Sequence, residues 1–109
     1  MMGEMIRVCE LEELKTRHAM RVTVNNEEVA LFYIERELHT VQNDCPHQHV
    51  QAIVQGILNG YEITCPMHGW TYDLKSGKAL IGAGNLQRYN VSINKGAVWI
   101  EDPEEQTSW

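Results

Sequence analysis

Positively charged residues are scarce in this sequence of 109 residues, which has nine Lys and Arg against fifteen Asp and Glu and a formal net charge of −6. A negative surface field repels the phosphates of nucleic acids and anionic lipid headgroups. The sequence also has no run of about 20 apolar residues, the length that spans a bilayer. We therefore expect neither nucleic acid nor a membrane among its partners.

The start of the sequence lacks the basic region and apolar run of a secretion signal, which predicts a cytoplasmic protein. Cysteine is scarce as well, with Cys9, Cys45 and Cys65. Three cysteines cannot all pair within one chain, and a reducing compartment keeps simple disulfides open. Two of the three therefore need an explanation other than a disulfide.

Long helical patterns, internal repeats and low-complexity stretches are also missing, and the length fits one domain over residues 1–109. Alternating apolar residues instead predict short strands separated by turns, which is typical of an all-β sandwich or small barrel. The last residues, 101–109, carry four acids, one proline and no alternation, and are predicted to be a mobile acidic tail. The predicted elements are a strand and about one helical turn over 6–14, then a hairpin over 19–34 that continues into a strand at 38–41 as an antiparallel meander, and a last hairpin over 89–100.

The middle of the chain, about residues 39–83, differs from the flanking hairpins because turn-forming residues interrupt it. Cys-Pro occurs at Cys45-Pro46 and again at Cys65-Pro66, and glycines recur between them and after them. Such residues favour loops and tight turns. This part is therefore predicted to be a loop-bearing insert, with short strands near 55–58, 61–64 and 71–74.

Two Cys-His pairs lie in this insert, Cys45-x-His47 and Cys65-x-x-His68, with seventeen residues between them. Two thiolates and two imidazoles at the tips of two loops form a four-ligand metal site. Zinc sites usually join paired ligands through about two to four intervening residues, so Cys-x-His is too tight for that pattern. An iron–sulfur cluster relaxes the requirement because each loop can supply one ligand to each of two irons. The spacing favours such a cluster over zinc.

The residues around these ligands resemble the two cluster-binding loops of Rieske-type ferredoxins, the small electron carriers of bacterial oxygenase systems. The resemblance rests on Cys45-Pro46-His47, on the run from Cys65 through Asp73 (C-P-M-H-G-W-T-Y-D), and on Ser76-Gly77. It implies an all-β fold, a three-sheet antiparallel sandwich with a small cluster-binding loop subdomain. It also implies one [2Fe–2S] cluster per chain, with Cys45 and Cys65 on the inner iron and His47 and His68 on the outer iron near the surface.

The sequence departs from some members of this family at two loops. Respiratory and photosynthetic Rieske proteins add a disulfide whose cysteines would fall at Val50 and Met67 here. Their absence indicates the disulfide-free ferredoxin branch. Many members also cover the cluster with a proline-containing third loop, whereas residues 81–85 contain glycines instead.

The remaining histidines and Cys9 have simpler interpretations. His49 lies two residues after His47, where a third imidazole would serve neither iron, so we interpret it as a solvated or partner-facing side chain. Cys9 is expected to be a small buried apolar residue. His18 and His39 flank strands without a partner motif, which favours surface or turn positions.

The ligand set offers no open coordination position, no nucleophile and no substrate pocket, so the chain is expected to move one electron and to catalyse nothing alone. The resemblance implies a carrier that accepts electrons from a flavin-dependent ferredoxin reductase and passes them to a terminal oxygenase of the ring-hydroxylating type. The docking surface is expected around the outer histidines, at Pro46, Gln48, His49, Met67, Gly69 and Trp70.

A second hypothesis comes from a different class of protein. The small subunit of assimilatory nitrite reductases resembles the same fold, including the Asp-x-x-Ser-Gly turn, but often lacks the four ligands. The presence of Cys45, His47, Cys65 and His68 favours the ferredoxin.

Overall fold

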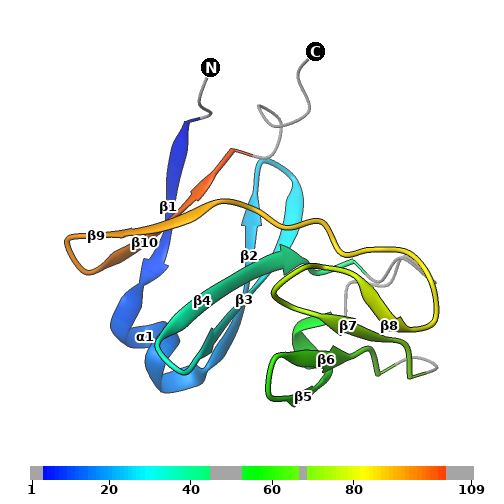
Figure 1. Cartoon of the computed structure of the whole chain (residues 1–109). Helices are drawn as coiled ribbons and strands as arrows, with labels where there is room; N and C mark the ends of the chain where they lie inside the picture. The colour runs from blue at the N-terminus through cyan, green and yellow to red at the C-terminus, as the bar shows by residue number, and fades with distance from the viewer. Residues whose placement is uncertain (1–3, 45–52, 67–68, 103–109) are drawn as a thin grey trace.

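The computed structural model describes residues 4–44, 53–66 and 69–102. These residues form three antiparallel sheets, and Figure 1 shows the four-stranded sheet lying to one side of the two three-stranded sheets. The all-β, three-sheet architecture expected from the sequence is confirmed.

The first sheet joins the two ends of the chain. Its strands follow the order β1, β10, β9, with β1 at Met5–Glu10, β10 at Ala97–Glu101 and β9 at Val91–Asn94. The hairpin of β9 and β10 turns at Lys95-Gly96, where both residues have positive φ angles of 54° and 77°. The predicted last hairpin is therefore present, and its central strand β10 also pairs with β1.

A single helix, α1 (Leu11–Arg17), connects the first sheet to the second. It buries Leu14, and its acidic first turn and basic last turn both complement the helix dipole. The helix ends at His18, which has a left-handed φ of 68° and whose N–H donates to the Leu14 carbonyl at 2.7 Å. The helix is longer than the single turn that the sequence predicts.

The second sheet is the predicted meander, with β2 at Ala19–Val24, β3 at Glu27–Ile34 and β4 at Glu37–Gln42. Both connections are two-residue turns, at Asn25-Asn26 and Glu35-Arg36, and all four residues have positive φ. Such turns match the right-handed twist of the strands they join.

The third sheet forms the predicted insert. Its strand β8 was missed by the sequence prediction, because β8 is short and its Leu80 and Ile81 side chains are exposed. The sheet follows chain order, after a 3₁₀ segment η1 (Ile53–Gln55), through β5 (Ile57–Asn59), β6 (Glu62–Thr64), β7 (Thr71–Asp73) and β8 (Ala79–Ile81).

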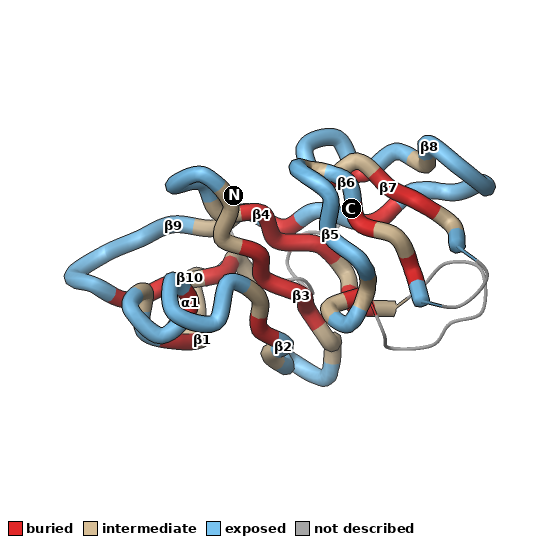
Figure 2. Tube along the Cα trace, turned by 90° about the horizontal axis from the view of Figure 1, so that it is seen from below, coloured by how far each residue is buried: buried red, intermediate tan, exposed pale blue. Residues whose placement is uncertain are grey.

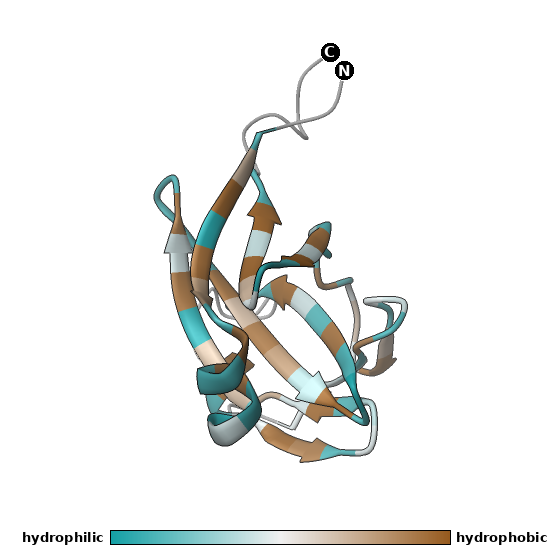
Figure 3. Cartoon of the chain, turned by 90° about the vertical axis from the view of Figure 1, so that its left-hand side faces the viewer, coloured by the Kyte–Doolittle hydropathy of each residue, from teal (hydrophilic) through white to brown (hydrophobic). Residues whose placement is uncertain are grey.

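The core has two parts, one on each face of the second sheet. Val29 and Leu31 of β3 pack with the first sheet and α1, whereas Ala30 and Phe32 pack with the third sheet. All four side chains are fully buried, as the red positions along β3 in Figure 2 show. A strand buried on both faces reads as a continuous apolar run. Figure 3 shows brown, hydrophobic positions along the strands and a largely teal, hydrophilic helix.

Three single-residue expectations can be compared with the structure. Cys9 is buried in β1 and His18 is exposed at the end of α1, as expected. The surface or turn position expected for His39 is wrong, because this residue lies inside β4 and is only 7% exposed. The third sheet covers it, with the Tyr61 ring edge-on at 5.2 Å.

Of the predicted tail 101–109, Glu101 and Asp102 lie within the described residues. Glu101 is the last residue of β10, and the Asp102 N–H donates to the Glu4 carbonyl at 2.8 Å. Within the described part of the chain, no helix has the length and apolar character needed to cross a bilayer.

Candidate metal centre

Cys65 lies at the base of the loop that joins β6 to β7. It directly follows Thr64, and its N–H donates to the Trp70 carbonyl at 2.7 Å. The Thr64 and Thr71 hydroxyl oxygens form a second link across the hairpin, 2.9 Å apart. Gly69, with a φ of 73°, completes the return of the chain into β7. These contacts close the base of the loop between Cys65 and Trp70.

The Cys65 side chain faces the core between the second and third sheets. Ile63 of β6 lies opposite Tyr72 of β7, and Cys65, two residues after Ile63, falls on the same face of the hairpin. All three side chains belong to one buried group, in which Cys65 is 1% exposed. The thiol is therefore shielded from solvent, with the Tyr72 ring on its side of the sheet.

Asn43 fastens the base of the other loop, which begins where β4 ends. Its carbonyl accepts the Ile53 N–H at 3.0 Å and its Oδ1 accepts the Val54 N–H at 2.7 Å. Its own N–H donates to the Glu28 carbonyl at 3.0 Å, and its side chain is fully buried. Sequence reasoning missed this residue, since a single Asn two positions before a Cys gives no distinctive signal.

The bases of the two loops pack directly against each other at Gly56. A Cβ at this position would lie 2.3 Å from the Thr64 carbonyl oxygen and 3.1 Å from that of Ile53. The Gly56 N–H also donates to the Ile53 carbonyl at 3.0 Å. The end of the first loop therefore lies against the residue that precedes Cys65, and only glycine allows this approach.

The glycine-containing third loop lies against Trp70. Gly82 has a φ of 97°, and a Cβ there would come within 2.3 Å of the indole ring. Trp70 is half-buried and packs on the same apolar group as Cys65. The backbone of this third loop thus packs against the Trp70 ring of the second ligand loop.

The Asp-x-x-Ser-Gly motif forms a turn after β7. The two carboxylate oxygens of Asp73 accept the Lys75 N–H at 3.0 Å and the Ser76 hydroxyl at 3.1 Å. Gly77 adopts a φ of 81° and donates its N–H to the Asp73 carbonyl. The motif is structural, because it turns the chain from β7 toward β8.

Of the four predicted ligands, Cys65 lies within the described residues, whereas Cys45, His47 and His68 lie outside them, as do Pro46, Gln48, His49 and Met67 of the expected docking surface. Within residues 4–44, 53–66 and 69–102, no three or more His, Cys, Asp or Glu side chains are grouped as metal ligands. The ligand assignment of the other three residues therefore stays a prediction.

Cys9 does not contribute to this site. It lies in β1 and packs in the other core group, with the first sheet and α1. Burial, and then the Glu13 carboxylate, raise the pKa of its thiol. A protonated thiol is a poor nucleophile and metal ligand.

The residues present fit a [2Fe–2S] cluster. The second loop presents a buried thiol, both loop bases are closed by hydrogen bonds, and the bases pack against each other. The two loops carry two cysteines and two histidines in sequence, which is the donor set of a Rieske centre.

Comparison with known sequences gives a consistent result. A protein-family model described as the Rieske [2Fe-2S] domain matches residues 4–88. The ferredoxin component of the naphthalene 1,2-dioxygenase system of Pseudomonas putida is 33% identical over 98 residues, which is 88% of this chain and 93% of that protein. The ferredoxin component of the naphthalene 1,2-dioxygenase/salicylate 5-hydroxylase systems of a Ralstonia species is 36% identical over 93 residues, covering 84% and 88%.

Solved structures with the same fold include a complex and a single subunit. A chain of the reduced complex between oxygenase and ferredoxin in carbazole 1,9a-dioxygenase matches with a TM-score of 0.82 and 25% identity, over 93% of this chain and 29% of that chain. A protein assigned as a nitrite reductase small subunit matches with a TM-score of 0.76 and 26% identity, over 89% and 97%. The ferredoxin of carbazole 1,9a-dioxygenase from Nocardioides aromaticivorans shares the fold, with a TM-score of 0.82 and 21% identity over 91% and 98%.

Proposed function

This chain belongs to the Rieske [2Fe-2S] domain family, and on that premise we propose that it is the ferredoxin of a ring-hydroxylating oxygenase system. It accepts one electron from a flavin-dependent reductase and delivers it to a terminal oxygenase. As a Rieske domain it carries one [2Fe–2S] cluster. It is an electron carrier and has no catalytic role of its own, and we place it in the cytoplasm.

The bound cluster supplies one reversible electron, at a potential raised by its two neutral imidazole ligands. In our proposal Cys45 and Cys65 hold the inner iron, and His47 and His68 hold the outer iron. The described residues support this task by shielding the Cys65 thiol from water and by fixing the two loop bases through Asn43 and Gly56. A rigid site lowers the reorganisation energy of electron transfer, because the surroundings of the cluster move little when its charge changes.

The observation that carries the proposal is the pattern of coverage among the relatives. The chain matches 93% of the Pseudomonas putida ferredoxin component, but 30% of the 4beta-methylsterol monooxygenase of Methylococcus capsulatus, at 29% identity. The chain therefore resembles a ferredoxin component over nearly the whole length of that protein, which supports the role of an electron carrier.

We propose that the oxygenase docks at the outer-iron side of the two loops. Within the described part of the expected docking surface, Gly69 is exposed and Trp70 is half-buried. Both belong to the loop that carries His68, so a partner that contacts them would lie next to this ligand.

A structural match to a protein assigned as a nitrite reductase small subunit, at a TM-score of 0.76 and 26% identity, supports the alternative. It is weaker, because the sequence relatives of 33% and 36% identity are oxygenase ferredoxins.

The proposal is tested by reconstitution. The purified protein is combined with a flavin-dependent reductase, NADH and the terminal oxygenase of such a system, and hydroxylated product is measured. Product should form with the wild-type protein and should be absent with Cys65→Ser. Electron delivery to the large subunit of a nitrite reductase, with none to the oxygenase, would overturn the proposal in favour of the alternative.

A further inference from the structure

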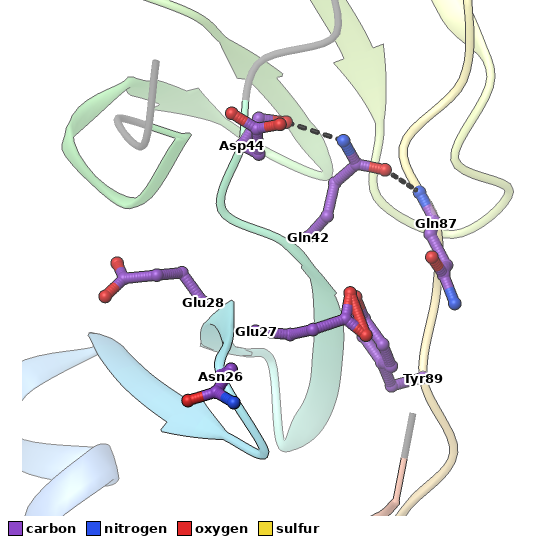
Figure 4. Close-up of a pocket in the computed structure, with 7 residues that line it drawn as sticks. All are labelled: Asn26, Glu27, Glu28, Gln42, Asp44, Gln87 and Tyr89. Atoms are coloured by element: carbon purple, nitrogen blue, oxygen red, sulfur yellow. Dashed lines mark hydrogen bonds between the residues drawn. The ribbon is translucent and has the colours of Figure 1, made fainter. Parts of the chain in front are cut away.

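An acidic groove lies at the end of the second sheet from which β4 leads to Cys45. It has a volume of about 360 Å³. Figure 4 shows side chains from three separate segments around it. They are Glu27 and Glu28 at the start of β3, Gln42 and Asp44 at the end of β4, and Gln87 and Tyr89 in the connection to β9.

Gln42 fixes the wall of this groove. Its Nε2 donates to the Asp44 carbonyl at 2.6 Å, and its Oε1 accepts the Gln87 N–H at 2.7 Å. The backbone of the same segment is tied by the Gln42 N–H, which donates to the Gln87 carbonyl at 2.9 Å. Two chain segments 45 residues apart are thereby held in one arrangement beside the groove.

The three carboxylates around the groove differ in what they already contact. Glu28 is engaged within the fold, since its Oε1 accepts a hydrogen bond from Asn43 at 3.3 Å and lies 3.5 Å from Arg21 Nε. Glu27 has no ion-pair partner among the described residues, and Asp44 adds a further negative charge. The lining of the groove is therefore acidic, and Glu27 is the carboxylate that makes no ion pair with another described residue.

Tyr89 gives a second, independent indication that the groove receives a ligand. The residue is only 6% exposed, and it lines the groove. Its N–H is bound to the Thr40 carbonyl at 3.0 Å, but its hydroxyl makes no hydrogen bond within the described part of the chain. Burial, with the nearby Glu27 carboxylate, raises the pKa of Tyr89 to about 12, so the phenol is neutral and can accept a hydrogen bond.

We propose that this groove receives a lysine or arginine side chain of the protein that exchanges electrons with this ferredoxin. The inference rests on the proposed function and names a contact of the partner. An ammonium or guanidinium group pairs with the Glu27 carboxylate and donates a hydrogen bond to the Tyr89 hydroxyl oxygen. Neither contact is made by another described residue.

The groove lies close in the chain to a predicted cluster ligand. Asp44 directly precedes Cys45, so a partner anchored here lies beside the first ligand loop. The net charge of −6 favours encounter with a positively charged partner surface. Such complementarity acts mainly on the association rate and on its dependence on salt.

The test uses cytochrome c, a basic haem protein, as a defined electron acceptor. The dithionite-reduced, desalted ferredoxin is mixed anaerobically with ferric cytochrome c, and the second-order rate constant is measured at low and high salt. Glu27→Lys should lower the rate at low salt by roughly threefold to tenfold, Glu27→Gln by less, and the differences should shrink as salt screens the charges.

Glu12→Lys is the matched control. It changes the net charge by the same amount, but Glu12 lies on α1, which precedes the start of β2, whereas the groove lies beyond the end of β2. Its side chain is 83% exposed, so the substitution should fold normally and should leave at least half of the wild-type rate. All variants should contain two irons per chain and reduce a small uncharged quinone at the wild-type rate.

Equal rates for Glu27→Lys and Glu12→Lys would overturn the proposal. So would tight binding of Ca²⁺ that Glu27→Gln abolishes while cytochrome c reduction is unchanged, because the groove would then be a metal site. A wild-type protein that reduces neither cytochrome c nor the quinone would instead contradict the proposed function itself.

Discussion

The α-carbon of Gly56 packs against the carbonyl oxygen of Thr64, so closely that an added Cβ would lie 2.3 Å from that oxygen. Thr64 is the residue before Cys65, and Gly56 follows η1 at the end of the first loop. This contact joins the bases of the two ligand loops through backbone alone. The distance between the loops therefore depends on the absence of a side chain at Gly56.

Gly56→Ala should destabilise the protein and reduce its cluster content. The methyl group has to displace backbone, and forcing extra volume into a packed site costs about 1–3 kcal/mol. Thermal unfolding of the iron-loaded protein, followed by circular dichroism, should give a lower Tm, and iron analysis should give fewer than two irons per chain. Gly60→Asn is the control, since no atom lies within 4 Å of a Cβ there and Asn tolerates its φ of 62°. A wild-type Tm for Gly56→Ala would contradict the account.

Cys65→Ser and Cys9→Ser should behave differently, although both cysteines are buried. Cys65→Ser should abolish the red-brown chromophore and lower the Tm, because a cluster that joins two loops stabilises the fold. Cys9→Ser should keep two irons per chain, since Cys9 packs in the other part of the core. Visible absorption and iron analysis distinguish the two. Loss of iron in Cys9→Ser at unchanged Tm would disprove the ligand assignment.

Tyr72→Phe should lower the reduction potential by about 20–60 mV, the equivalent of one hydrogen bond to the reduced centre. The family resemblance predicts that its hydroxyl donates toward a cluster sulfur. The structure places the Tyr72 side chain in the buried group that contains Cys65. Tyr61→Phe is the control, because Tyr61 lies in the turn before β6, at the opposite end of that strand from Cys65. Equal potentials for Tyr72→Phe and the wild-type protein would show that the phenol points elsewhere.

His39 should make the protein less stable as the pH falls below about 6.5. Burial lowers the pKa of the His39 side chain. The Glu37 carboxylate, whose Oε1 lies 3.4 Å from His39 Nε2, raises this pKa, and the charges of Arg88 and Lys75 lower it. The unfolded chain, with a pKa near 6.5, then binds more protons than the folded one, so stability is lost on acidification from about pH 7 to pH 5. The free energy of unfolding, measured in denaturant at both pH values, should fall less in His39→Gln than in the wild-type protein. His18→Gln, at an exposed position, should keep the wild-type difference.

The strands were largely predictable because their side chains alternate or form buried runs. The meander of β2, β3 and β4 has both apolar strands and turn residues in its sequence. Strand β8 was not predictable, because its apolar Leu80 and Ile81 are exposed and no alternation marks them. The burial of His39 was missed for a related reason, since the packing of the third sheet over β4 is a tertiary feature.

The ligand motifs could be identified from sequence because their residue types and spacing are chemically restrictive. The residues that support them could not, because Asn43 and Gly56 act through contacts with Val54 and Thr64 that no local pattern encodes. The acidic groove is harder still, since Glu27 and Tyr89 come from segments that only the fold brings together.

The account depends most directly on ligation by two thiolates and two imidazoles. Electron–nuclear double resonance on the dithionite-reduced protein tests it, because the electron resides on the histidine-bound iron and couples to coordinated nitrogen. The wild-type protein should contain two irons and two labile sulfides per chain and should show two strongly coupled nitrogens. A reducible cluster without nitrogen coupling, or a protein that holds no cluster, would contradict the assignment of His47 and His68 as ligands.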